Sequence, residues 1–107
     1  MATKEDIARA IADLGVTGLR VSTFAGAAVV DDGEALGVFR AEALLGAAQT
    51  LLRGGASVQV GEDQARVRAA LVRRAGLLVR GDEADRALHE KIVAEWTARS
   101  YRGPWRS

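Results

Sequence analysis

The sequence predicts an α+β fold, in which a small antiparallel sheet of about four to five strands packs against two or three helices. Three observations lead to this prediction. Apolar residues recur at helical spacing near the start, in the middle and near the end of the chain. Between these segments they alternate with polar residues, as in strands. Single glycines, the Gly54-Gly55 pair and an Asp-Gly step separate the segments, so the predicted order is α-ββ-α-β-β-(β)-α.

The first helix is expected to begin after Thr3, whose side chain can cap its N-terminus, with Asp6 in a position like that of a capping box. Ile7, Ile11 and Leu14 then fall on one helical face. The glycine that follows Leu14 is a typical C-terminal stop.

Residues 19–30 are expected to form two strands, or one long strand bent at Gly26. Residues 19–23 alternate in the manner of a half-buried strand, and residues 24–30 are a run of small apolar residues. The run ends at Asp31-Asp32-Gly33, where the Asp-Gly step indicates a tight turn.

A central helix is expected over residues 34–53, ended by Gly54-Gly55, with Gly37 allowing residues 34–39 to form a short strand first. Its apolar stripe consists of Leu36, Phe39, Ala43, Leu44, Ala47, Ala48, Leu51 and Leu52.

The next segment fits two patterns. Val58 and Val60 alternate with polar neighbours and indicate a strand. Residues 65–72 and 77–80 are interpreted as two further strands joined at residues 73–76. A helical stripe is also present, at Val67, Leu71, Ala75 and Leu78, and Ala and Arg are good helix formers.

The last helix is expected to begin at Asp82 as N-cap, with Leu88, Ile92 and Trp96 as its buried line. Residues 1–100 are expected to form a single compact domain and residues 101–107 an irregular tail.

The predicted order of elements resembles the Roadblock/LC7 and longin-like interaction domains, whose helix–hairpin–helix–strands–helix plan forms dimeric scaffolds. The resemblance lies in the order of elements and no residue motif carries it, and residues 19–24 supply one strand more than that plan. It implies a protein-interaction function and a dimer.

Composition limits the chemistry. The chain has 107 residues, no cysteine and a net charge of +1, which excludes disulfides, thiolate chemistry and a strong global field for polyanions. The N-terminal residues lack the apolar core of a signal peptide, and no apolar run reaches the roughly 20 residues that cross a bilayer. We therefore expect a cytoplasmic or virion protein with no membrane partner and no cofactor.

Two groups of side chains are candidate catalytic or metal sites. His89, the only histidine, follows Asp82 and Asp85 at spacings that can share a helical face. Asp31, Asp32 and Glu34 could place paired carboxylates at a hairpin tip. A capped, solvated helix explains the first group and turn chemistry the second, so no catalytic or metal site is predicted and the protein is expected not to be an enzyme.

Two other groups are candidate binding surfaces. Arginines on the predicted strands could gather into a patch for anions, although outward charges on strands also prevent aggregation; they are Arg66, Arg68, Arg73 and Arg74, together with Arg80. The tail concentrates side chains typical of binding hot spots, namely Tyr101, Arg102, Trp105 and Arg106. Trp105 could instead fold back over the chain's own core.

The sequence therefore favours a non-enzymatic assembly or protein-interaction subunit that forms a homo-oligomer. A virion connector or completion protein and a dimeric regulatory scaffold both fit this interpretation. The alternative is a small nucleic-acid-binding regulator that uses the arginine-rich strands.

Overall fold

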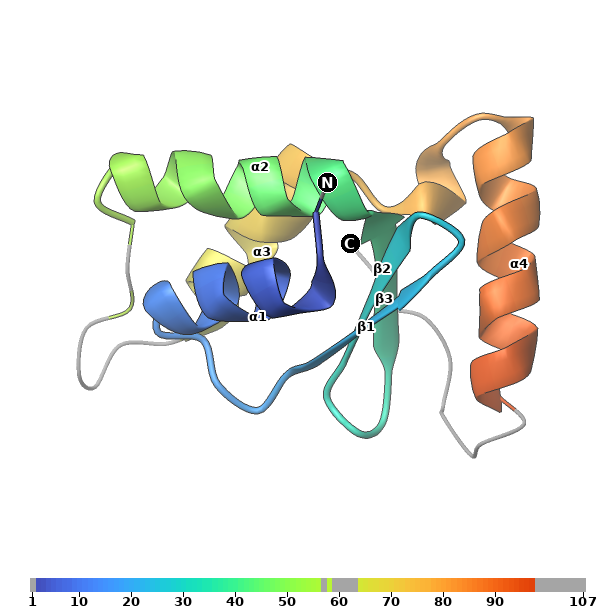
Figure 1. Ribbon diagram of the computed structural model, residues 1–107, viewed down its shortest axis with the longest axis horizontal. Coiled ribbons are helices and arrows are strands. Elements are labelled where there is room, and N and C mark those ends of the chain that lie inside the picture. Colours follow the sequence, from blue (N-terminus) through green and yellow to red (C-terminus); the bar gives the residue numbers. More distant parts are fainter. Residues whose placement is uncertain (1, 57, 59–63, 98–107) are drawn as a thin grey trace.

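The computed structural model describes residues 2–56, 58 and 64–97, which form an α+β fold with one sheet between two helical layers (Figure 1). Helices α1, α2 and α3 lie on one side of the sheet and α4 lies on the other. Within these residues the elements are α1 (Lys4–Asp13), β1 (Arg20–Phe24), β2 (Ala27–Asp31), β3 (Leu36–Arg40), α2 (Ala41–Arg53), α3 (Gln64–Ala75), the 3-10 turn η1 (Leu78–Arg80) and α4 (Glu83–Thr97). None of the helices in this part of the chain is long and apolar enough to cross a membrane.

Helix α1 begins as its sequence predicts. The hydroxyl of Thr3 accepts a hydrogen bond from the backbone N–H of Asp6 at 3.1 Å, which satisfies one of the free donors of the first turn. Ile7, Ile11 and Leu14 are buried, so the predicted apolar face is confirmed.

Strands β1 and β2 form a hairpin, which settles the choice between two strands and one bent strand. Arg20 lies opposite Asp31, and Phe24 lies opposite Ala27. The two residues between the strands, Ala25 and Gly26, both have positive φ, at 50° and 82°. Two such residues are typical of a type I′ turn, whose twist matches that of the flanking strands.

Strand β3 takes the first part of the segment expected to be the central helix. The helix α2 begins only at Ala41, and residues 36–40 pair with β2 instead, so the short strand allowed by Gly37 is the observed structure. The turn at Asp31-Asp32-Gly33 brings these residues beside β2, where Val38 and Phe39 fit a buried strand.

The prediction of two strands at 65–72 and 77–80 is wrong. Residues 64–75 form helix α3 and residues 78–80 form η1, so the sheet has three strands among the described residues rather than four or five. Val67 and Leu71 lie one turn apart and both are buried, so the helical stripe prevailed over the alternation. The element order on which the Roadblock-like resemblance depended is therefore not observed. Of the strand expected at Val58 and Val60, only Val58 is described, and its N–H donates to the carbonyl of Leu14 at 2.7 Å.

The core lies on both faces of the sheet, and every residue of the central strand β2 is buried. The face toward α1, α2 and α3 is the larger one, built from Ile7, Ile11, Leu14, Ala28, Val30, Phe39, Leu44, Ala48, Val67 and Leu71 among others. The face toward α4 is smaller and contains Ala27, Val29, Leu36, Val38, Leu78, Ile92 and Trp96. The predicted buried line of the last helix is confirmed at Ile92 and Trp96, while Leu88 is half-buried beside them.

Candidate functional site

The two edges of the sheet differ in how they are covered. Strand β3 is buried from Leu36 to Phe39, and η1 lies against it. Strand β1 has Arg20 and Thr23 exposed and its other three residues only half-buried. The β1 edge is therefore the accessible one in the part of the chain that the structure describes.

The hairpin register shows which backbone groups β1 presents at this edge. In a hairpin with a two-residue turn, the residues that flank the turn exchange hydrogen bonds, and bonded and non-bonded pairs then alternate. Phe24, Ser22 and Arg20 consequently bond to β2, while the N–H and C=O groups of Val21 and Thr23 point away from it. The N–H of Ala41 donates to the carbonyl of Gly26, the residue just before β2. This bond agrees with the alternation, because it shows that the even-numbered residues here direct their backbone groups toward β3 rather than β1.

These outward groups have no partner within the described residues. No hydrogen bond reaches the backbone of Val21 or Thr23 from the outer side in the described ranges. An uncovered row of strand donors and acceptors is a template for pairing with another strand. Of the devices that usually block such pairing, β1 has one charged side chain, Arg20 at its first position, and it contains no proline and no bulge.

An open groove of about 730 Å³ adjoins the end of this edge. The hairpin tip from Ser22 to Gly26 forms one wall, and the first residues of α1 and α2 form the other. The N–H of Ala2 donates to Oε1 of Glu42 at 2.8 Å and so fastens the N-terminal segment to α2. The two helix N-termini already have carboxylates in their first turns, at Glu5, Asp6 and Glu42.

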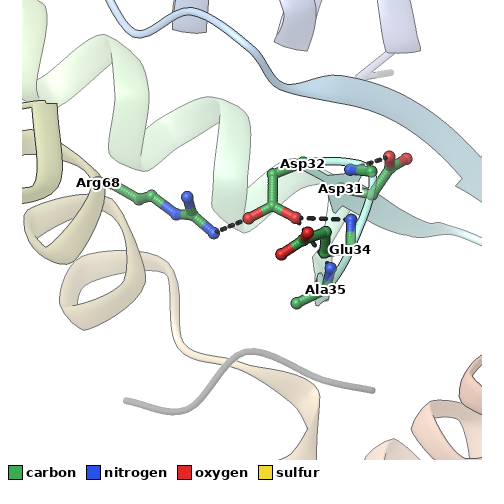
Figure 2. Close-up of polar contacts among 6 residues, drawn as sticks. Asp31, Asp32, Glu34, Ala35 and Arg68 are labelled. Atoms are coloured by element: carbon green, nitrogen blue, oxygen red, sulfur yellow. Dashed lines mark hydrogen bonds and ion pairs between the residues drawn. The ribbon is translucent and has the colours of Figure 1, made fainter. Parts of the chain in front are cut away.

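The acidic residues at the second hairpin form a turn rather than a catalytic pair (Figure 2). Asp32 accepts hydrogen bonds from the N–H groups of Glu34 and Ala35 at 3.0 and 2.8 Å, and Asp31 accepts one from Gly33 at 3.1 Å. The bond from Ala35, helped by the bond from Glu34 and by Arg68, lowers the pKa of Asp32 against the opposing effect of burial. These carboxylates therefore stabilise the connection between β2 and β3.

The three residues considered as a candidate site around His89 have separate roles in the structure. His89 is buried on α4 with 6% of its surface exposed, and burial lowers the pKa of its imidazole. Asp85 instead forms an ion pair with Arg40, and Asp82 caps α4 by accepting from the N–H of Asp85 at 2.9 Å. The structure shows no group of three metal-ligating side chains among the residues that it describes.

The four arginines of the candidate anionic patch all lie on α3, but one of them, Arg68, is in a different environment from the other three. Arg66, Arg73 and Arg74 are exposed on α3. Arg68 is half-buried and forms an ion pair with Asp32 at 3.2 Å, so it serves the fold. Arg73 and Arg74 line an open groove of about 540 Å³ together with Leu51 and Ala70.

The tail residues Tyr101, Arg102, Trp105 and Arg106 lie outside the described residues, so their predicted contact role stays a prediction.

The β1 edge was missed by sequence reasoning. The alternation in residues 19–23 indicates a strand, but only the strand order shows that this strand lies at an edge.

Comparison of this chain with models of protein families, with curated proteins and with solved structures finds no match.

Proposed function

We propose that this chain is a non-enzymatic assembly or protein-interaction subunit that forms homo-oligomers. The observation that carries the proposal is the open edge of β1, with the outward backbone groups of Val21 and Thr23. A virion connector or completion protein and a dimeric regulatory scaffold are the two classes of assembly that this proposal includes. Either would operate in the cytoplasm or in a virion.

The physical argument concerns the size of the sheet. The described residues form three strands, of which one is fully buried, and this provides a small core; aromatic residues make up only 5% of the chain. Apolar burial contributes roughly 25 cal/mol per Å², so a core of alanine and valine gains less than one rich in large side chains. Association at the open edge adds main-chain hydrogen bonds and buried area that a chain of this size otherwise lacks.

The test is the native mass of the purified chain, measured by light scattering or native mass spectrometry between about 1 and 100 µM. A dimer or larger oligomer at tens of micromolar supports the proposal. A monomer throughout this range contradicts it, because assembly would then need another protein.

A nucleic-acid-binding regulator is the second candidate. It is supported by the exposed arginines Arg66, Arg73 and Arg74 on a single helix, beside the groove at Leu51 and Ala70. Guanidinium groups bind phosphates bidentately, and such binding weakens steeply with salt. A gel-shift titration at 50 and 200 mM salt tests this candidate, with Arg73→Ala and Arg74→Ala compared against Arg9→Ala on α1. Binding that is equal in all three variants, or insensitive to salt, would exclude the α3 surface.

A further inference from the structure

The outward backbone groups of β1 are arranged so that they can form hydrogen bonds with the same groups of a second copy of the chain. This inference rests on the proposed function. We propose that β1 pairs antiparallel with β1 of a second copy about a two-fold axis at Ser22. The pairing joins the two sheets, each of three strands among the described residues, into one continuous sheet. The proposal follows from the pattern of outward backbone groups and from the side chains that such pairing places opposite one another.

The backbone groups are symmetric about Ser22. Val21 and Thr23 each direct one N–H and one C=O outward, and Ser22 between them directs its groups toward β2. When the axis passes through Ser22, Val21 of one copy exchanges both hydrogen bonds with Thr23 of the other, and the second such pair follows by symmetry. All the outward groups of Val21 and Thr23 on both copies are then used. An axis at Val21 or at Thr23 would centre a single bonded pair on that residue and would not pair Val21 with Thr23.

The side chains are compatible with this register. Val21 lies opposite Thr23, a pair of β-branched residues, and Ser22 lies opposite Ser22. Arg20 lies opposite Phe24, so no two like charges are directly opposed. The guanidinium of Arg20 also lies 3.7 Å from the buried carboxylate of Asp31 in its own copy. This carboxylate offsets the charge of Arg20 where it approaches Phe24 of the other copy and the ammonium of Lys91 beside that ring.

The same register places equivalent faces together. A two-fold axis perpendicular to the sheet leaves both α4 helices on one face of the continuous sheet, with the helices α1 to α3 of both copies on the other. The small core between α4 and the sheet thereby lies next to its symmetry mate. Phe24, half-buried at the margin of that core, comes to lie at the interface.

Cysteine cross-linking tests the register, because the chain has no cysteine of its own. The two Ser22 residues form a non-hydrogen-bonded pair with Cα atoms about 4.5 Å apart, which is within the range that a disulfide spans. The matched control is Thr23→Cys, one residue along the strand. In this register the two Thr23 Cα atoms are about 8 Å apart, from the rise and spacing of paired strands, which is too far for a disulfide. Mild oxidation should therefore convert Ser22→Cys almost completely to a covalent dimer and leave Thr23→Cys monomeric on a denaturing gel.

A second pair of variants tests the backbone contact without relying on disulfide chemistry. Thr23→Pro removes an outward N–H that bonds to nothing within the described chain, so the monomer should keep its circular dichroism spectrum. Its dimer should dissociate at concentrations at least tenfold higher than those of the unaltered chain. Thr23→Ala retains the N–H and should assemble like the unaltered chain.

The outcomes separate this inference from the proposed function. Cross-linking of Ser22→Cys together with dissociation of Thr23→Pro supports the β1 pairing. An oligomer that survives Thr23→Pro, with no Ser22→Cys cross-link, overturns the β1 pairing and leaves assembly through another surface. A monomeric unaltered chain at 100 µM overturns both. If Thr23→Pro loses its native spectrum, the cross-linking pair alone decides.

Discussion

Arg68 on α3 donates a hydrogen bond to Oδ2 of Asp32 at 3.2 Å and so joins this helix to the turn between β2 and β3, 36 residues away in the chain (Figure 2). Each side chain keeps about a third of its surface exposed. The bond holds α3 against the sheet at a point where Asp32 already accepts two backbone N–H groups. It explains why Arg68 is half-buried while Arg66, Arg73 and Arg74 on the same helix are exposed.

Replacing Arg68 should destabilise the fold more than replacing an exposed arginine. We expect Arg68→Ala to lower the free energy of unfolding by about 1 kcal/mol, since a partly exposed ion pair that also forms a hydrogen bond contributes on that order. Arg73→Ala, on the exposed side of α3, is the matched control and should change it by less than about 0.5 kcal/mol. Urea denaturation measures both. Equal losses in the two variants would show that the bond to Asp32 contributes nothing.

The carboxylate of Asp32 should make stability depend on acid pH. The backbone N–H of Ala35 is the main cause that holds the pKa of Asp32 below its ordinary value of 3.8 in the folded chain. The unfolded chain therefore binds the proton more readily, and the stabilisation by Asp32 is present above about pH 4 and lost as pH falls through the folded pKa. Asp32→Asn keeps a side-chain acceptor without the charge. The difference in unfolding free energy between the two proteins should be largest near pH 6 and shrink below pH 4. A difference that stays constant from pH 6 to pH 2 would contradict this.

The β1–β2 turn contains a residue poorly suited to its conformation. Ala25 has φ of 50°, in the left-handed region where an L-residue other than Gly, Asn or Asp is disfavoured by about 1 kcal/mol. Asn-Gly is the preferred pair for a type I′ turn. We expect Ala25→Asn to raise the free energy of unfolding by about 0.5–1 kcal/mol, with Ala28→Asn in the buried middle of β2 as a destabilising counterpart. No gain from Ala25→Asn in urea denaturation would mean that the turn is not type I′ in solution.

Sequence patterns predict the parts of this fold that are decided locally. The cap at Thr3, the buried side chains of α1, the Asp31-Asp32-Gly33 turn and the start of α4 at Asp82 all depend on residues within a turn or two of one another. These were predicted correctly because a cap or a tight turn needs few partners.

The predictions from sequence were wrong or incomplete for segments whose structure depends on residues far away in the chain. Val67 and Leu71 fit both a strand and a helix, and burial against α2 and the sheet selected the helix. For residues 34–39 the sequence allowed either the start of the central helix or a short strand, and pairing with β2 decided for a strand at residues 36–40. The open edge of β1 follows from the strand order β1-β2-β3, which no local pattern contains. The candidate site depends on that order and was therefore the least predictable feature.

The last prediction concerns His89, which is the only histidine of the chain. Its side chain is buried on α4, and burial lowers the pKa of the imidazole from its ordinary value of 6.5, an effect that the neighbouring carboxylate of Glu90 partly opposes. The folded chain therefore holds His89 neutral at a pH where the unfolded chain has already protonated it. Protonation of the imidazole then favours unfolding. The free energy of unfolding should therefore be highest above about pH 7 and should decrease as pH falls through 6.5 toward the folded pKa of His89.

A single histidine makes this dependence simple to isolate, since the carboxylates titrate mostly below pH 5. His89→Leu replaces the imidazole by an apolar side chain that is neutral at every pH and suits a buried position next to Ile92. Between pH 5 and pH 7.5, urea denaturation of the unaltered chain should give an unfolding free energy that rises with pH. The variant should give a nearly flat line and should be the more stable protein at pH 5. Parallel slopes for the two proteins would show that the imidazole is accessible to water in the folded state, contrary to its burial in the structure.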